Sequence, residues 1–181
     1  HSRWIENGRI SFLQWRRPQI EMWDVKPDLS GFEGRGKVVI ENSADCVPTG
    51  KGLAEGSQLF KKDGWYYLFN ICWPKDYCRM VACHRAKSLE GPWEGKVVYA
   101  CEGIAQGGIV DTPDGKWYAY LFGDRGGVGR IPYMIPITWE DGWPKFPQTG
   151  GEGVYKGLPD YIRPPLEIPG VVKDAIPGCC A

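Results

Sequence analysis

The chain has 181 residues, enough for one substantial core, and carries 22 Lys and Arg against 22 Asp and Glu. A formal net charge of zero provides no basic field to attract nucleic acid or an anionic membrane surface. No apolar run approaches the roughly 18 residues of a membrane-spanning helix. The sequence therefore predicts neither a nucleic-acid partner nor a membrane partner.

The composition favours short strands over helices, because the chain has 25 Gly, 15 Pro, 9 Trp, 9 Tyr and 6 Phe. It begins with His1 and shows no signal peptide, so we expect the natural N-terminus to lie further upstream and predict no compartment. Seven unevenly spaced cysteines resemble neither a disulfide framework nor a zinc site. We expect free thiols, mostly buried, and no bound metal.

One hairpin signature recurs at intervals of about 50 residues. Each copy starts with Asn-Gly or Asp-Gly, the strongest short-range signal for a tight hairpin turn. Each continues into a run rich in aromatic and branched residues, which is typical of a strand. The copies lie at residues 7–13, 63–69 and 114–121.

A second signature recurs between the copies of the first, at residues 29–40 and 89–99 and, more weakly, at 139–146. Each unit therefore holds two hairpins, and four short strands in about 50 residues are typical of a β-propeller blade. A sandwich would also have many strands, but it would not explain a paired motif at nearly constant period. We predict an all-β fold with about three propeller blades over residues 1–147 and an irregular Gly- and Pro-rich tail over 148–181.

Glu55 is the first candidate for chemistry. It stands between Ala54 and Gly56, just ahead of an apolar segment. Small neighbours leave space around the carboxyl, and partial desolvation favours its protonated form, which suits a general acid. A surface Glu in a turn fits the same pattern equally well.

Other candidates have simpler structural explanations beside the functional ones. Trp73 follows a strand and could stack on a sugar ring, or it could cap the core. His84 lies in a strand-like segment, where a structural role is favoured. The glycine-dense run at 123–130 lacks the Lys-Ser/Thr ending of a phosphate loop, although two arginines on a loop could reach a polar ligand.

Three segments, at residues 55–68, 103–118 and 128–144, resemble glycoside hydrolase family 43. Members of this family are five-bladed β-propellers that cleave xylosides, arabinosides and related glycans by inversion. The resemblance covers roughly residues 1–147 and implies that the chain holds about three of the five blades. It implies that Glu55 is the general acid and that Arg130 contacts the sugar. We also predict Trp73, Gln106 and Arg125 as substrate-binding residues.

The resemblance also shows what the chain lacks. The family uses an Asp base and a second Asp that tunes the acid, and neither has a match here; Asp24 and Asp28 fall in an outer hairpin and do not replace them. Residues 4–9 resemble the family sequence just past the tuning Asp, which implies a C-terminal fragment. Gln106 stands where many members carry a His beside a central calcium, and Arg125, which has no acceptor, where His is expected. Gln106 can still offer a carbonyl to calcium, so the resemblance leaves calcium possible, but we predict no cofactor.

The leading hypothesis is a glycosidase that acts on arabinose- or xylose-containing oligosaccharides or polysaccharides. This chain would supply the acid and not the base. A non-catalytic carbohydrate-binding or degenerate propeller is the alternative, and a protein-interaction propeller is a third possibility. The sequence does not predict the sugar, the linkage or the oligomeric state.

Overall fold

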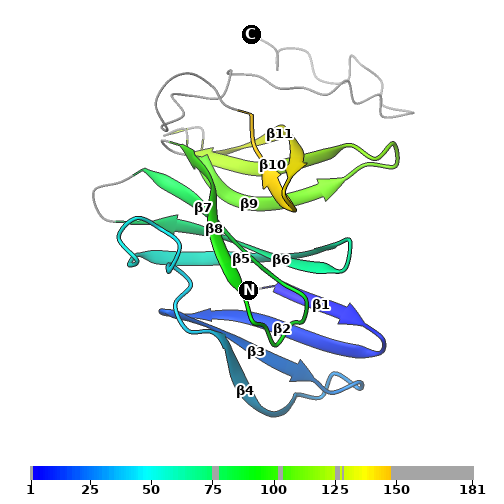
Figure 1. Ribbon diagram of the computed structural model, residues 1–181. Coiled ribbons are helices and arrows are strands. Elements are labelled where there is room, and N and C mark those ends of the chain that lie inside the picture. Colours follow the sequence, from blue (N-terminus) through cyan, green and yellow to red (C-terminus); the bar gives the residue numbers. More distant parts are fainter. Residues whose placement is uncertain (1, 75–77, 102–103, 125–126, 128, 148–181) are drawn as a thin grey trace.

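Figure 1 shows a computed structural model of the chain, which describes residues 2–74, 78–101, 104–124, 127 and 129–147. These residues form twelve strands in three four-stranded sheets, and none of them lies in an α-helix. The described ranges accordingly contain no helix that could span a bilayer. The predicted all-β fold is confirmed, whereas the predicted tail at 148–181 lies outside the described residues.

Each sheet is a meander in which every strand pairs antiparallel with the next. The first sheet contains β1 (Ser2–Glu6), β2 (Arg9–Arg16), β3 (Gln19–Val25) and β4 (Phe32–Ile40). The second contains β5 (Leu53–Lys62), β6 (Trp65–Trp73), β7 (Arg79–Ala86) and β8 (Glu94–Cys101). The third contains β9 (Ile104–Asp111), β10 (Trp117–Asp124), β11 (Arg130–Glu140) and β12 (Trp143–Lys145).

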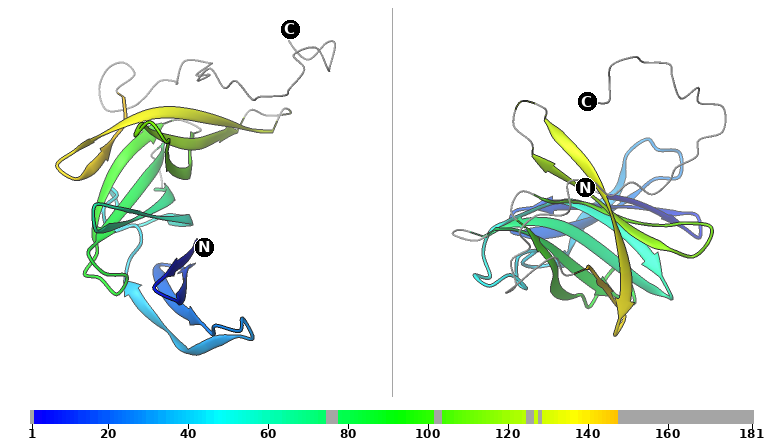
Figure 2. Two further views of the ribbon diagram at one scale, coloured as in Figure 1. Left: turned by 90° about the vertical axis from the view of Figure 1, so that its right-hand side faces the viewer. Right: turned by 90° about the horizontal axis from the view of Figure 1, so that it is seen from above.

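The three sheets follow one another as an open arc (Figure 2). Their first strands are neighbours, because β1 contacts β5 and β5 contacts β9. A hydrogen bond joins the first pair, with the Leu59 N–H donating to Ser2 Oγ at 2.9 Å. This is the arrangement of inner strands in consecutive propeller blades, so the chain forms three blades of an unclosed propeller, as predicted.

Two of the three recurring turns have the geometry that their sequences predict; in the third, only Gly115 has positive φ, and residues 112–116 form a longer loop between β9 and β10. In the β1–β2 and β5–β6 turns, Asn7, Gly8, Asp63 and Gly64 all have positive φ. A two-residue turn of this kind matches the right-handed twist of the flanking strands. The sequence predicted two hairpins per blade and missed a third, since β2 and β3 are joined directly through Arg17-Pro18 without a glycine.

The core lies between the sheets, and β6 is buried on both faces. Tyr67, Phe69 and Ile71 pack against the third sheet, whereas Tyr66 and Leu68 pack against the first. Burying a large apolar side chain stabilises a fold by roughly 1.5–3 kcal/mol. Two-sided burial explains the nearly continuous apolar sequence of β6, and the predicted buried strand is confirmed.

The structure also places the described cysteines and His84. Cys72 and Cys83 are buried free thiols, and Cys46 and Cys78 are partly buried free thiols. The imidazole of His84 is fully buried, and its Nε2 lies 2.9 Å from Asp45 Oδ1. Both findings agree with the structural roles that the sequence favoured.

Candidate active site

Glu55 lies on the inner strand of the second blade, at a break in the strand's register. Pairing between β5 and β6 shifts from Glu55 opposite Ile71 to Gln58 opposite Phe69, so β5 bulges at this point. Gly56 adopts a φ of +68° inside the bulge, a conformation that side-chain-bearing residues rarely adopt. Such bulges re-aim side chains and are frequent beside active sites.

Residues close to Glu55 in the sequence are buried, whereas its own carboxylate is half-buried and has no partner among the described residues. Ala54 and Ser57 are fully buried, and Ser57 Oγ accepts a hydrogen bond from Asn70 Nδ2 at 2.8 Å. The Glu55 side chain is half-buried, and no hydrogen bond or ion pair joins it to any residue that the structure describes. The bulge therefore presents an unengaged carboxylate on a rigid strand.

Gln106, on the inner strand of the third blade, packs directly over Gly56. A Cβ added at Gly56 would lie 2.4 Å from Gln106 Nε2, so the contact requires glycine. Gln106 thus lies beside the residue that follows Glu55. The inner strands β5 and β9 approach each other closely at this point.

A cavity of about 240 Å³ opens at this junction of the second and third blades. Its volume is below the roughly 300–1,000 Å³ of sites for drug-sized ligands, which suits a single sugar ring. Burial raises the pKa of Tyr120, so its phenol is protonated and can donate a hydrogen bond. The lining residues come from four strands and are Gly56, Gln58, Gln106, Gly107, Tyr120, Leu121, Phe122 and Pro132.

A row of alternating charged and aromatic groups extends from the cavity. The Arg130 guanidinium lies 4.8 Å from the ring centre of Phe122, and its Nε donates to Asp124 Oδ1 at 3.1 Å. Asp124 also pairs with Arg79, whose guanidinium lies 4.2 Å from the ring centre of Trp73. Hydrogen bonding from Arg79 holds the pKa of Asp124 below its usual value. The row therefore links Trp73 to Arg130 through an ionised carboxylate.

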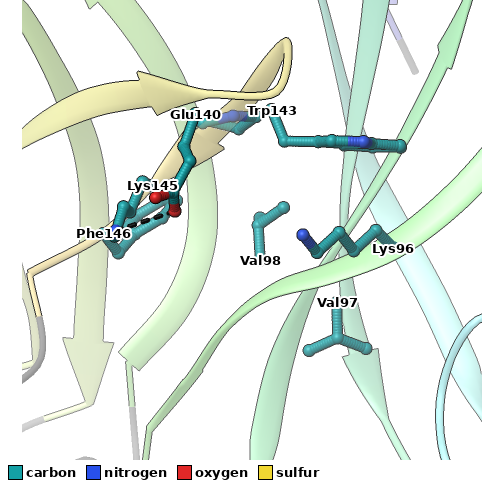
Figure 3. A pocket seen from close by; sticks show the side chains of 8 residues that line it. Lys96, Val97, Val98, Glu140, Trp143, Lys145 and Phe146 are labelled. Carbon is teal, nitrogen blue, oxygen red and sulfur yellow. Dashed lines mark ion pairs between the residues drawn. The ribbon is translucent and has the colours of Figure 1, made fainter.

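A second, smaller cavity of about 170 Å³ lies between β8 and the β11–β12 hairpin (Figure 3). Trp143 extends over Lys96 and Val98, and Glu140 pairs with Lys145 at 2.7 Å. It involves the last strands of the two blades, β8 and β12, and none of the residues that the sequence predicted for catalysis or binding. The cavity beside Glu55 is therefore the better candidate.

Comparison with known proteins shows the family of the chain. The model of the family "Glycosyl hydrolases family 43" matches residues 4–144, which is most of the chain. The chain belongs to glycoside hydrolase family 43. Its predicted family resemblance is thus confirmed.

Relatives within family 43 bear xylosidase and arabinosidase names. A putative beta-xylosidase of Xylanibacter ruminicola is 33% identical over 154 residues, which cover 78% of this chain and 27% of the relative. A xylosidase/arabinosidase of Butyrivibrio fibrisolvens is 29% identical over 128 residues, covering 59% of this chain and 25% of the relative. The chain thus spans about a quarter of the length of these curated relatives.

Solved structures of family 43 proteins have the same fold. A bifunctional GH43-CE protein of Bacteroides eggerthii superposes with a TM-score of 0.77 at 46% identity, covering 94% of this chain and 22% of that one. A xylan beta-1,4-xylosidase from Bacillus halodurans superposes with a TM-score of 0.67 at 22% identity, covering 92% of this chain and 36% of that one. The second similarity concerns the fold alone.

The predicted family 43 site residues fall into three groups. Glu55 and Gln106 lie on adjacent inner strands, on either side of Gly56. Trp73 and Arg130 belong to the charged row, where Trp73 is 43% exposed and the Arg130 side chain is 65% exposed. Arg125 lies outside the described residues. The one group of three potential metal ligands that the described residues bring together contains neither Glu55 nor Gln106.

Sequence reasoning missed three members of this region: Arg79, Asp124 and Tyr120. Arg79 and Asp124 are joined by an ion pair between different blades. The two residues are far apart in the sequence and lie on different strands, so no local pattern could have predicted the contact. Tyr120 could have been found, because it alternates with buried Ala119 and Leu121 and so had to face away from the core.

Proposed function

We propose that this chain forms part of a glycoside hydrolase that cleaves arabinose- or xylose-containing glycans with inversion of the anomeric centre. Glu55 is the general acid that protonates the leaving oxygen. The observation that carries the proposal is the position of Glu55 on a bulged inner strand, next to Gly56, which lines a cavity of about 240 Å³. The xylosidase and arabinosidase names of the relatives support the class of substrate.

A free carboxyl on a rigid strand fits the work of a general acid. The acid has to hold its proton until the glycosidic oxygen arrives, and then donate it over hydrogen-bonding distance. An ion pair with Lys or Arg would keep Glu55 ionised, and no such pair exists among the described residues. Gln106 and Tyr120 can meanwhile hydrogen-bond the hydroxyls of a sugar in the cavity.

The charged row serves binding in this proposal. Arg130 is the only one of the predicted binding residues that carries a permanent positive charge and lies in the described part of the chain. Asp124 fixes its Nε, which leaves the other guanidinium nitrogens free to donate to sugar hydroxyls. Trp73 already stacks on Arg79, and its exposed part can pack against a sugar ring.

Inversion also requires a second carboxylate that activates water, at roughly 6.5–9.5 Å from the acid. Glu6 is the carboxylate on the neighbouring inner strand, but it contacts Lys61, six residues along β5 from Glu55. At about 3.3 Å per residue that separation is roughly 20 Å, too far for the shared water. We propose that the base is an Asp of the whole enzyme outside these 181 residues.

The proposal is tested by hydrolysis of nitrophenyl α-L-arabinofuranoside and nitrophenyl β-D-xyloside. The isolated chain should be inactive, and the whole enzyme active with inversion, which NMR of the first-formed sugar detects. Glu55→Gln in the whole enzyme should lower kcat by roughly 10²–10⁴-fold, the usual contribution of general acid catalysis. Glu33→Gln, at an exposed position of β4, is the matched control and should change nothing.

Hydrolysis by the whole enzyme that survives Glu55→Gln would overturn the assignment of the acid. One observation favours a second function: the described residues offer no free carboxylate opposite Glu55, so the cavity could bind a glycan without cleaving it. In that case calorimetry would detect binding of xylo- or arabino-oligosaccharides while the whole protein showed no turnover. Binding that is lost in Arg130→Ala would then support the binding function.

A further inference from the structure

The segment that links β4 to β5 is a rigid loop packed against the second blade. Asn42 fixes it at both ends, since its Oδ1 accepts from the Ala44 N–H at 3.1 Å and its Nδ2 donates to the Gly50 carbonyl at 2.9 Å. Ala44 is almost completely buried. Asp45 and Cys46 are therefore held on fixed backbone against the sheet.

Three different ligand types meet where this loop contacts β7. A carboxylate oxygen of Asp45, the Sγ of Cys46 and a ring nitrogen of His84 all lie within 4.8 Å of one another. The His84 Nε2 and Asp45 Oδ1 atoms are 2.9 Å apart. Ligand atoms around a tetrahedral zinc ion are roughly 3.4–3.6 Å apart, given bond lengths of about 2.0–2.3 Å. Shifts of about 1 Å would therefore convert this group into a coordination site.

Gly95 lies directly beside two of these atoms. It is opposite His84 in the register of β7 and β8. A Cβ added at Gly95 would lie 2.7 Å from His84 Nε2 and 2.8 Å from Asp45 Oδ1. The absence of a side chain at residue 95 therefore lets the imidazole and the carboxylate lie together against β8.

The three groups differ in burial: His84 is fully buried, whereas Asp45 is partly exposed. This arrangement suits an ion with one coordination position open to water. His84 is fully buried, and its other ring nitrogen, Nδ1, has no hydrogen-bond partner in the described part of the chain. The imidazole is thus held by Asp45 alone. The Asp45 side chain is 48% exposed, so an ion can enter from solvent and keep a water ligand on that side.

We propose that Asp45, Cys46 and His84 bind a divalent transition-metal ion, zinc by preference, that fastens the loop to the second blade. One oxygen, one nitrogen and one sulfur ligand suit zinc, whereas calcium and magnesium take oxygen ligands. Binding replaces the thiol proton with a zinc–sulfur bond and releases that proton to solvent. The site is independent of the proposed glycosidase function, since none of the three residues lines the cavity beside Glu55.

The test is titration of the metal-free chain with Co²⁺, which reports its ligands by absorption. We expect one equivalent to produce visible d–d bands of a tetrahedral ion and a near-ultraviolet thiolate-to-cobalt band, both abolished by Zn²⁺. Zn²⁺ should also raise the Tm of the chain, because it binds the folded state. Absence of the thiolate band at saturating Co²⁺ would overturn the proposal.

Variants separate this site from binding elsewhere on the chain. Cys46→Ser should remove the thiolate band and weaken Zn²⁺ binding by more than the roughly 10–100-fold that loss of an outer-shell partner costs. Cys78→Ser changes a partly buried thiol of the same apolar cluster and should leave both unchanged. Gly95→Ala keeps all three ligands, crowds His84 Nε2 and Asp45 Oδ1, and should weaken binding. Equal binding in wild type, Cys46→Ser and Gly95→Ala would exclude this site.

Discussion

The carboxylates at the two ends of β5 differ in their hydrogen bonding. At the hairpin end, Glu6 from the first blade accepts hydrogen bonds from Lys61, from the Tyr66 hydroxyl and from Trp4 Nε1. At the other end, the Glu55 carboxylate has no hydrogen bond or ion pair with any residue in the described ranges. One strand therefore carries a fully engaged carboxylate site and an unengaged one.

The difference assigns a structural role to Glu6 and a proposed functional role to Glu55. Glu6 joins two blades, and the Lys61 hydrogen bond lowers its pKa to about 2. Buried polar groups in folded proteins are mostly hydrogen-bonded. The half-buried Glu55 carboxylate has no such bond to any described residue, so it is available to a bound molecule. We propose that this molecule is the substrate, which completes the hydrogen bonds of Glu55.

Gly56 in β5 and Gly64 in the adjoining turn also differ in their surroundings. Replacing them should give the largest change in the free energy of unfolding among these predictions. Gly56 and Gly64 both have positive φ, but a Cβ at Gly56 meets Gln106, whereas at Gly64 it meets nothing within 4 Å. Gly64→Ala should cost about 1–2 kcal/mol for the left-handed backbone. Gly56→Ala should lower the free energy of unfolding by about 2–4 kcal/mol, because overpacking against Gln106 adds about 1–3 kcal/mol.

Denaturant unfolding of the two variants measures this difference directly. Both substitutions carry the same backbone penalty, so the excess in Gly56→Ala isolates the contact with Gln106. In the whole enzyme, Gly56→Ala should also lower kcat/KM, while Gly64→Ala should not. Equal losses of stability in both variants would show that Gln106 yields without cost and that the close approach of β5 and β9 is unimportant.

Asp124 offers an intermediate effect at the Glu55 end of the third blade. Asp124→Asn should weaken the grip on Arg79 and Arg130 and so raise KM several-fold in the whole enzyme, with a smaller change in kcat. The rise in KM follows from weakening a charge-assisted hydrogen bond. Asp114→Asn is the matched control, because Asp114 pairs with Lys116 in the exposed β9–β10 turn and should leave KM unchanged. A fall in kcat alone would contradict the binding role of Arg130.

The sequence predicted the blades well because their signals are local. Asn-Gly and Asp-Gly turns and the apolar run of β6 each act within one hairpin, and their period gave the number of sheets. The hairpin between β2 and β3 was missed, since Arg17-Pro18 carries no glycine signal. The family resemblance then singled out Glu55 and Gln106, which pattern alone left open.

The rest of the site depends on contacts between blades, which no local pattern encodes. Arg79 meets Asp124 across a blade boundary, and Asp45 reaches His84 from a loop 39 residues earlier in the chain. Such pairs form only after the sheets have packed. The bulge at Gly56 could not be predicted locally for the same reason, because its contact with Gln106 on β9 forms only when the blades pack together.

The smallest expected effect is a pH dependence at the hairpin end of β5. Because the folded-state pKa of Glu6 lies at about 2, below the ordinary value of 4.5 for a glutamate, its ion pair stabilises the fold above pH 4.5. This contribution should be lost as the pH falls from about 4.5 to about 2, when the carboxylate becomes protonated in the folded state. Thermal unfolding between pH 7 and pH 2 should therefore show a smaller fall in Tm for Glu6→Gln than for the wild-type chain. An equal fall in Tm for Glu6→Gln and the wild-type chain would show that Glu6 does not stabilise the fold through its ion pair.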